Sequence, residues 1–142
     1  MIILVSGFPG SGKSYFAERF AARLGASYLN SDRIRKEMSA AGLYSFRDRL
    51  LVYKEMLRQT ALVATSGKSV VVDATFYNHI IREMFINVAK AQSLQLFIIE
   101  VVADEDLIKE RLKKPRKFSE ADFSTYEVVR DQFEEITMHI LF

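Results

Sequence analysis

The stretch "GFPGSGKS", residues Gly7 to Ser14, follows directly after the apolar run "IILVS" of residues 2–6. It contains three of the six glycines and one of the two prolines of the 142-residue chain. Glycine has no Cβ, so the backbone can turn tightly and bring its N–H groups close to a ligand. A short continuous apolar run is typical of a strand buried on both faces, as in a parallel sheet. The stretch therefore predicts a glycine-rich turn between a buried strand and a helix over residues 14–24.

The spacing Gly7-x4-Gly12-Lys13-Ser14 fits the P-loop pattern, in which backbone N–H groups hold phosphate oxygens at a helix N-terminus. We expect Lys13 to reach the β- and γ-phosphates of a nucleoside triphosphate and the Ser14 hydroxyl to ligate Mg²⁺. The sequence thus predicts ATP and Mg²⁺ as cofactors. The predicted nucleotide-binding residues in this stretch are Gly7, Pro9, Gly10, Ser11, Gly12, Lys13, Ser14 and Tyr15.

The composition is that of a globular domain, with 49% hydrophobic and 27% charged residues, and the length suits a single domain over residues 1–142. The net charge of +2 provides no global field that favours nucleic acid or an anionic membrane. The chain has no cysteine, which excludes disulfides and thiolate metal sites. No apolar run reaches the roughly 20 residues that a bilayer requires, and the N-terminal run is too short for a signal peptide. We expect a cytoplasmic protein without a membrane contact.

The rest of the chain alternates strand and helix patterns, which predicts a parallel α/β sheet of five strands with helices on both faces. After the first strand, the expected strands cover residues 27–32, 69–73, 94–102 and 137–142. After the first helix, the expected helices cover residues 32–38, 48–65, 82–90, 104–114 and 122–135.

Three further features distinguish among the kinases, GTPase switches and motor ATPases that share a P-loop. Asp32 follows the second expected strand, and Arg35 would lie on the same face of the next helix. Asp73 ends the third expected strand, with Arg82 nine residues later. Residues 111–117, "RLKKPRK", carry five basic side chains in seven positions.

At these motifs the chain resembles the P-loop kinase family that includes the 5′-kinase domain of polynucleotide kinases, and more loosely the zeta-toxin and gluconate kinases. The resemblance covers the glycine loop, "NSDRIR", the "DATF" stretch with Arg82, and "ERLKKPRKFSEAD". It implies a P-loop NTPase fold with a five-stranded parallel sheet and a short helical lid over ATP. It also implies transfer of the γ-phosphoryl group to a hydroxyl.

The resemblance implies roles on the acceptor side of the cleft. Asp32 is similar to the general base that orients the acceptor hydroxyl, and Arg35 to a residue that binds an anionic group of the acceptor. Asp73 resembles the acid that holds a Mg²⁺-bound water or the Lys13 region, and Arg82 an acceptor-side arginine. Helix capping by the two aspartates and solvent exposure of the two arginines are the alternatives.

In the lid, the resemblance implies that Arg116 clamps the transferring phosphoryl group and that Arg111 faces the nucleotide. The implied catalytic residues are therefore Lys13, Asp32 and Arg116. Arg111 and Arg116 are five positions apart around Pro115, which differs from relatives that carry arginines four apart, so the choice between them stays open.

The sequence leaves the acceptor undecided between a small metabolite and a 5′-OH polynucleotide. Aromatic and basic residues before the long central helix are candidates for the acceptor pocket: Tyr44, Phe46, Arg47 and Arg49. The alternative function is a nucleotide-binding switch or regulatory ATPase module. The absence of an Asn-Lys-x-Asp segment disfavours a GTPase switch. The preference for ATP over GTP and the oligomeric state also stay open.

Overall fold

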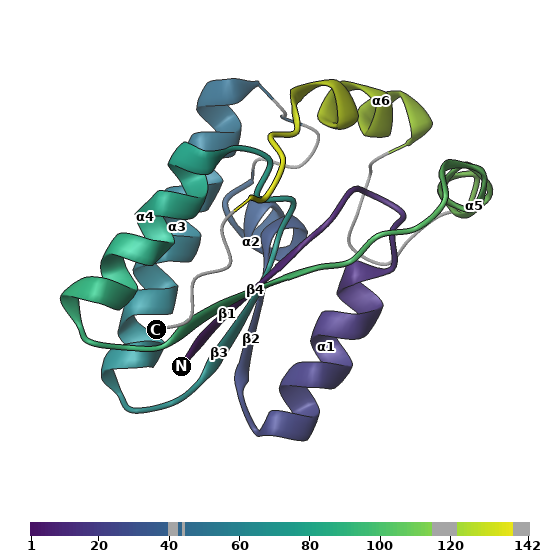
Figure 1. The fold of residues 1–142 in the computed structure, drawn as a ribbon. Coiled ribbons are helices and arrows are strands. Elements are labelled where there is room, and N and C mark those ends of the chain that lie inside the picture. Colours follow the sequence, from purple (N-terminus) through teal and green to yellow (C-terminus); the bar gives the residue numbers. More distant parts are fainter. Residues whose placement is uncertain (40–42, 44, 115–121, 138–142) are drawn as a thin grey trace.

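The computed structural model of the protein describes residues 1–39, 43, 45–114 and 122–137. Each strand in this part of the chain is followed by one or two helices (Figure 1). The strands are β1 (Ile2–Ser6), β2 (Ser27–Asn30), β3 (Val70–Asp73) and β4 (Leu96–Glu100). The helices are α1 (Lys13–Leu24), α2 (Ser31–Glu37), α3 (Phe46–Thr65), α4 (His79–Ala91), α5 (Glu105–Leu112) and α6 (Phe123–Gln132).

The strands form one parallel sheet with the order β2-β3-β1-β4. β1 and β3 lie inside the sheet, so the loop after β1 is flanked by the carboxyl ends of β3 and β4. Val5 of β1 pairs with Asp73 of β3, and Asp73 pairs in turn with Asn30 of β2. This register brings the carboxyl ends of β1, β2 and β3 to the same end of the sheet, beside the glycine loop.

The number of strands corrects the prediction of five, because the described residues form four. The expected fifth strand, residues 137–142, lies outside the described residues except for Thr137. β2 is also shorter than predicted and ends at Asn30. The Asn30 side chain accepts a hydrogen bond from the backbone N–H of Arg33, so α2 begins at Ser31 instead of after Asp32.

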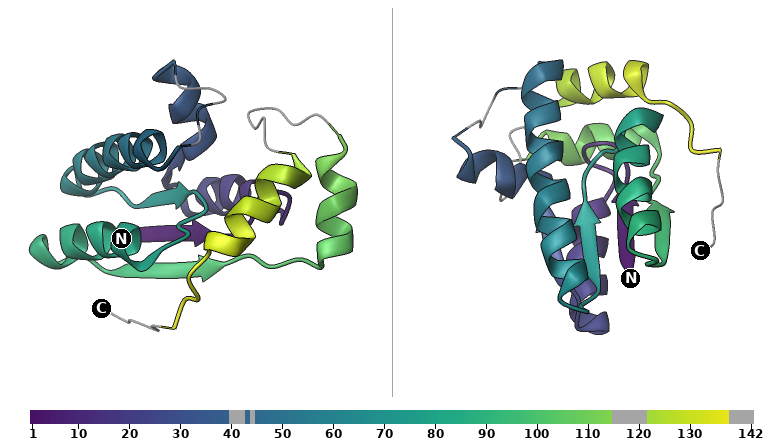
Figure 2. Two further views of the ribbon diagram at one scale, coloured as in Figure 1. Left: turned by 90° about the horizontal axis from the view of Figure 1, so that it is seen from above. Right: turned by 90° about the vertical axis from the view of Figure 1, so that its left-hand side faces the viewer.

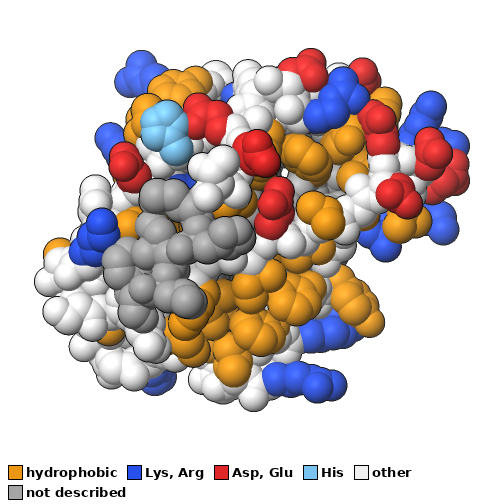
Figure 3. All heavy atoms as spheres, viewed as in Figure 1, with side chains coloured by type: hydrophobic (Ala, Val, Ile, Leu, Met, Phe, Trp, Pro, Cys, Tyr) orange, Lys and Arg blue, Asp and Glu red, His pale blue; other side chains and the backbone are white. Residues whose placement is uncertain are grey.

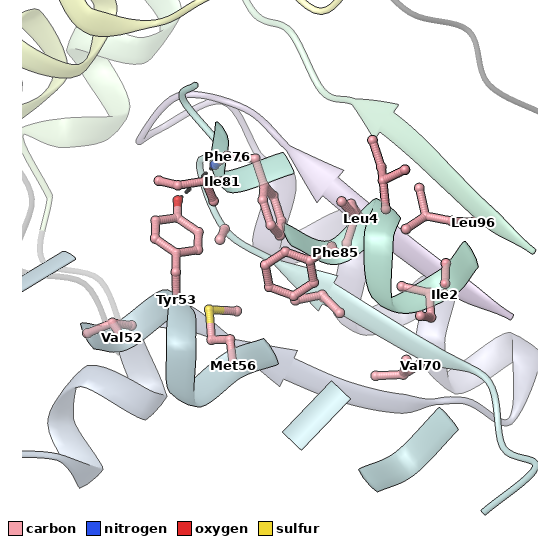
Figure 4. Close-up of a cluster of buried hydrophobic side chains, with 14 of the residues drawn as sticks. Ile2, Leu4, Val52, Tyr53, Met56, Val70, Phe76, Ile81, Phe85 and Leu96 are labelled. Atoms are coloured by element: carbon pink, nitrogen blue, oxygen red, sulfur yellow. Dashed lines mark hydrogen bonds between the residues drawn. The ribbon is translucent and has the colours of Figure 1, made fainter. Parts of the chain in front are cut away.

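One face of the sheet packs against α3 and α4 and carries the larger core. The side chains of alternate strand residues, such as Leu4, Val72 and Leu96, point into this core. Figure 4 shows Met56 and Phe85 among them. Burial of these apolar side chains is the main source of stability, at about 25 cal/mol per Å² of apolar surface. It also fixes the position of β3 relative to α3.

The other face of the sheet packs against α1. Its buried residues are Ile3, Val5, Ala17, Ala21 and Val71. Partly buried side chains of α1 and β4 extend this cluster to the surface, and Figure 3 shows hydrophobic side chains gathered over these elements. The apolar face anchors α1, and with it the helix N-terminus that follows the glycine loop.

α5 and α6 lie at the end of the sheet toward which the strands point (Figure 2). A third, smaller cluster joins them to the glycine loop through Phe8. The Phe8 ring contacts the rings of Tyr126 and Phe133 edge to face, with centroids 5.6 and 4.9 Å away. Phe8 therefore ties the loop to the C-terminal part of the chain. Among the described helices, none combines the length and apolar character that a bilayer crossing requires.

Candidate functional site

The glycine loop adopts a conformation that depends on its glycines. Gly10 and Gly12 have φ values of 80° and 94°, in the left-handed region that residues with a Cβ rarely adopt. A Cβ on Gly7 would lie only 2.6 Å from the carbonyl oxygen of Val101. A Cβ on Gly10 would lie 3.1 Å from side-chain atoms of both Ile108 and Leu112. The loop therefore turns tightly and packs closely against α5. Its backbone N–H groups lie at the start of α1.

A pocket of about 480 Å³ opens beside this loop. Its lining residues are Gly10, Gly12, Lys13, Ser14, Tyr15, Arg111 and Lys114. Lys13 is the first residue of α1 and is buried, while the Tyr15 side chain is exposed. The pocket thus combines a helix N-terminus with cationic side chains, an arrangement suited to phosphate groups. It also brings together five of the predicted nucleotide-binding residues of the loop with the predicted Arg111.

The other three predicted loop residues lie outside this pocket. Gly7 and Ser11 shape the turn, and Pro9 lines a second pocket described below. The Ser11 hydroxyl oxygen is buried without a hydrogen-bond partner among the described residues. A buried hydroxyl in this position is suited to bonding a bound phosphate oxygen.

Arg111 of α5 closes one side of the first pocket. Its Nη1 donates a hydrogen bond to the carbonyl oxygen of Gly10 at 3.1 Å. The same nitrogen would lie 3.3 Å from a Cβ on Gly12. The guanidinium group therefore sits directly on the glycine loop. The predicted Arg116 lies outside the described residues, as does the rest of the basic stretch 111–117 from residue 115 onward.

A polar network joins the start of α1 to the ends of β2 and β3. Asp73 is fully buried, and its Oδ2 accepts hydrogen bonds from the Tyr28 hydroxyl at 2.6 Å and from Asn30 Nδ2 at 2.8 Å. Asn30 Nδ2 also lies 3.4 Å from the Ser14 hydroxyl oxygen. Burial, and next the negative charge of Asp73, raise the pKa of the Tyr28 hydroxyl, which stays a donor. The sequence pattern did not indicate Tyr28 and Asn30 as site residues, although both lie within five residues of Asp32.

The other oxygen of Asp73, Oδ1, is buried and has no hydrogen-bond partner among the described residues. A buried carboxylate oxygen without a donor is costly unless it meets a cation or a water. Magnesium prefers one or two carboxylate or hydroxyl ligands, with the rest supplied by phosphates and water. Ser14 and Asp73 share the donor Asn30 and therefore fit such a site. The described residues contain no group of three or more His, Cys, Asp or Glu side chains that would hold a metal alone.

A second, smaller pocket of about 50 Å³ lies on the other side of Lys13. Its lining residues are Pro9, Lys13, Ser31, Asp32, Arg35, Arg49, Tyr53, Thr75, Tyr77, Thr125 and Val129. Asp32 Oδ1 accepts a hydrogen bond from Arg35 Nη1 at 2.8 Å, and both side chains are largely buried. Asp32 does not cap α2, because Asn30 does. The structure thus excludes the capping alternative for Asp32 and places its carboxylate on the pocket wall.

Several residues of this second pocket come from α3 and from the turn after β3. Phe76 has a φ of 50°, unusual for a residue with a side chain, and is fully buried. Its backbone N–H donates to the Tyr53 hydroxyl at 2.9 Å, the bond drawn in Figure 4. Because Phe76 is fixed in this conformation, its neighbours Thr75 and Tyr77 both line the pocket. Thr75 belongs to the "DATF" stretch, but nothing in the local pattern indicated Tyr53.

Among the residues expected before the central helix, Arg49 lines the second pocket, whereas Phe46 and Arg47 are exposed to solvent. Tyr44 lies outside the described residues. Of these four residues, Arg49 is therefore the one whose position keeps it a candidate for the acceptor pocket.

Arg82 differs from the expectation of an acceptor-side arginine. Its Nε donates to the Phe76 carbonyl oxygen at 2.8 Å, and its two Nη atoms donate to the carbonyl oxygens of Glu134 and Glu135. The side chain is buried, and this burial lowers the pKa of the guanidinium below its ordinary value. Arg82 does not line either pocket. Its contacts instead tie the turn after β3 to the segment that follows α6.

Comparison with known proteins gives a consistent family and fold. The family model described as an AAA domain (AAA_33) matches residues 2–139. Uncharacterized proteins of Mycobacterium tuberculosis H37Rv and Mycobacterium bovis are 34% identical over 87 residues. Each match covers 53% of this chain and 18% of the relative, so the chain spans only a small part of the relatives' length.

Solved structures of kinases share the fold. A sugar kinase from Janibacter sp. HTCC2649 has a TM-score of 0.74 at 18% identity, over 95% of this chain and 78% of that chain. A gluconokinase from Sinorhizobium meliloti 1021 has a TM-score of 0.71 at 22% identity, over 94% and 74%. The APS kinase CysC of Mycobacterium tuberculosis, in complex with AMPPNP and APS, has a TM-score of 0.65 at 24% identity, over 80% and 68%. The likeness shows the α/β fold of P-loop kinases, with a parallel sheet flanked by helices.

Proposed function

The chain belongs to the AAA_33 family of AAA domains, and we propose that it transfers the γ-phosphoryl group of ATP to a hydroxyl of a small molecule. The observation that carries the proposal is the position of Lys13, which lines both pockets. One pocket has the glycine loop and Arg111 on its walls, and the other has Asp32. A side chain shared by the two pockets is suited to neutralising a phosphoryl group that passes from one to the other.

We assign the proton-accepting role to Asp32. Arg35 holds Oδ1 of this carboxylate, so Oδ2 is the oxygen that would accept the proton of the acceptor hydroxyl. The acceptor oxygen forms a new bond to the γ-phosphorus, and the bond from that phosphorus to the β,γ-bridging oxygen breaks. ADP leaves with the bridging oxygen, and the acceptor proton resides on Asp32. The Asp32–Arg35 ion pair keeps the carboxylate in one orientation throughout.

The remaining residues of the first pocket would stabilise the charge on the phosphates. The loop N–H groups, Lys13 and Arg111 supply donors and positive charge, and Arg116 is proposed as the lid residue that clamps the γ-phosphoryl group. Mg²⁺ would be held by Ser14 and Asp73 and would supply further charge neutralisation on the phosphates. We do not assign Arg82 to the acceptor, because its three hydrogen bonds go to backbone carbonyls.

A small acceptor is favoured over a polynucleotide on two grounds. The pocket that carries Asp32 has a volume of about 50 Å³, which suits a small polar group. The structural neighbours include proteins described as a sugar kinase and a gluconokinase. The net charge of +2 adds no general attraction for a nucleic-acid backbone.

The test is a phosphotransfer assay with γ-³²P-labelled ATP and Mg²⁺. The acceptor panel comprises sugars, sugar acids, nucleosides and a 5′-OH oligonucleotide. We expect label on a small acceptor and a loss of kcat of about a hundredfold or more in Asp32→Asn, with the affinity for AMPPNP unchanged. Asp106→Asn, which neutralises an exposed aspartate on α5, is the matched control and should retain full activity.

Two results would count against this proposal. Transfer that proceeds equally well in Asp32→Asn would remove the base assignment. Absence of transfer to every acceptor, together with nucleotide-dependent binding of a partner protein, would favour the alternative of a regulatory nucleotide-binding module.

A further inference from the structure

The second pocket has an excess of positive charge. Its lining contains three cationic side chains, Lys13, Arg35 and Arg49, and one carboxylate, Asp32. Arg35 forms an ion pair with Asp32 at 2.8 Å, which balances these two charges against each other. Lys13 also lines the nucleotide pocket and has the phosphates as its proposed partners. The charge of Arg49, the third cation of this pocket, is matched neither by the Asp32 carboxylate nor by the proposed nucleotide phosphates.

Arg49 is held in place without an anionic partner among the residues that the structure describes. Its guanidinium carbon lies 4.6 Å from the centroid of the Tyr77 ring, a cation–π contact. Its Nε is buried and has no hydrogen-bond partner within the described part of the chain. The ion pairs that the described residues form do not include Arg49. A buried guanidinium nitrogen without an acceptor is unfavourable, so the arrangement is suited to a ligand that supplies one.

Tyr77 provides a second donor at the same place. Its side chain is 5% exposed, and its hydroxyl is buried without a hydrogen-bond partner among the described residues. Burial raises the pKa of this hydroxyl, although the nearby Arg49 opposes the effect, so the group stays protonated. Arg49 Nε and the Tyr77 hydroxyl are thus two donors without an acceptor among the described residues. Their side chains contact each other and line the same pocket.

We propose that the acceptor is an alcohol that also carries an oxyanion, a carboxylate or a phosphate, and that Arg49 and Tyr77 bind this group. The inference rests on the proposed phosphotransfer at Asp32 and specifies the substrate class of that site. An oxyanion accepts hydrogen bonds from both donors and matches the charge of Arg49. The anion-binding role that the sequence suggested for Arg35 thereby falls to Arg49, since Arg35 is engaged by Asp32.

Binding of matched probes tests this inference independently of turnover. The protein is first saturated with AMPPNP and Mg²⁺, so that the glycine loop is occupied and cannot bind the probe. Calorimetric titration then compares gluconate with glucitol, and glycerol 3-phosphate with glycerol. We expect one anionic member to bind at least about tenfold more tightly than its neutral partner, as a charge-assisted hydrogen bond provides. The pair that shows the preference identifies the oxyanion as a carboxylate or a phosphate.

Variants assign the preference to the two residues. Arg49→Ala should remove the difference between the anionic and neutral members, and Tyr77→Phe should reduce it by a smaller factor. Lys54→Ala removes an exposed cation from the same helix and should leave the difference unchanged. If Arg49→Ala does not fold, as judged by circular dichroism, the difference in affinity between anionic and neutral probes is measured in Arg49→Lys and Tyr77→Phe instead.

The outcomes separate this inference from the proposed function. Equal binding of charged and neutral probes, no binding of either anion, or the same result for Arg49→Ala and Lys54→Ala would overturn the inference. Asp32-dependent transfer to neutral alcohols in the same protein would then leave the phosphotransfer proposal standing. Conversely, Arg49-dependent anion binding without any phosphotransfer would support the oxyanion site and remove the kinase step.

Discussion

Asn30 Nδ2 donates a hydrogen bond to Asp73 Oδ2 at 2.8 Å, and this contact links the carboxyl ends of β2 and β3. The same side chain caps α2 with its oxygen, since Asn30 Oδ1 accepts from the Arg33 backbone N–H. One amide thus sets the start of the helix that carries Asp32 and orients the carboxylate proposed to face Mg²⁺. This dual role can be separated by substitution.

Asn30→Asp should keep the cap but lose the donor to Asp73. Aspartate caps helices as well as asparagine does, whereas a second carboxylate beside the buried Asp73 introduces like-charge repulsion. We expect a loss of about 1–3 kcal/mol in the free energy of unfolding without metal. Excess MgCl₂ should restore more stability to Asn30→Asp than to the unmodified protein, as measured by urea unfolding at both conditions.

The control for this prediction is Asn78→Asp. Asn78 caps α4 and accepts from the Ile81 N–H at 2.9 Å, in the same geometry as the cap of α2. This variant should unfold at nearly the same urea concentration as the parent, with or without MgCl₂. An equal loss in both variants would show that the effect lies in the cap and not in the contact with Asp73.

Gly10→Ala should destabilise the protein more than Gly67→Ala. Both glycines have similar backbone angles, with φ of 80° and 84°, so both substitutions incur about 1–2 kcal/mol of left-handed strain. A Cβ on Gly10 also meets Ile108 and Leu112 at 3.1 Å, whereas one on Gly67 meets nothing within 4 Å. The difference, about 1–3 kcal/mol by chemical denaturation, measures how tightly the loop packs on α5. A smaller loss in Gly10→Ala than in Gly67→Ala would show that α5 moves freely to make room.

Arg82→Ala should lower the free energy of unfolding by about 2–3 kcal/mol, because a buried bond to the Phe76 carbonyl oxygen and two part-buried bonds to the carbonyl oxygens of Glu134 and Glu135 lose their charged donor. Thermal unfolding followed by circular dichroism measures the loss. Arg58→Ala is the control, since Arg58 is exposed and its ion pair is with the nearby Glu55 on α3. This variant should change the free energy of unfolding by less than about 1 kcal/mol. Retention of full stability in Arg82→Ala, combined with a raised KM for the acceptor, would restore Arg82 to the acceptor side.

Local patterns in the sequence predicted most of the fold. The apolar runs at residues 2–6 and 70–73 are buried strands, and the helix expected after the glycine loop begins one residue earlier, at Lys13. These elements follow from periodicity and from turn residues, which are properties of neighbouring positions. The end of β2 was predicted wrongly because the residue that stops it, Asn30, is fixed by both a cap and a contact with Asp73, 43 positions away.

The sequence indicated candidate site residues that belong to local motifs, and it did not indicate those whose positions depend on tertiary contacts. Asp32 and Lys13, which the motifs indicated as candidates, line the same pocket, and their catalytic roles stay a prediction. Two of the three hydrogen-bond partners of Arg82, in contrast, lie more than 50 positions later in the chain, and no spacing rule links them to Arg82. Tyr53 and Tyr77 likewise meet only after α3 has packed on the turn that follows β3. Long-range packing of this kind is not visible as a local pattern.

The segment after α6 is fastened to the turn after β3, where the Glu134 N–H donates to the Tyr77 carbonyl oxygen at 2.6 Å. α6 contributes Thr125 and Val129 to the second pocket. If the proposed function holds, replacements in the last quarter of the protein should therefore change which alcohol is phosphorylated, without altering the glycine loop near the start of the chain. Chimeras that exchange only this terminal portion between kinases of the same architecture offer a direct route to new acceptors.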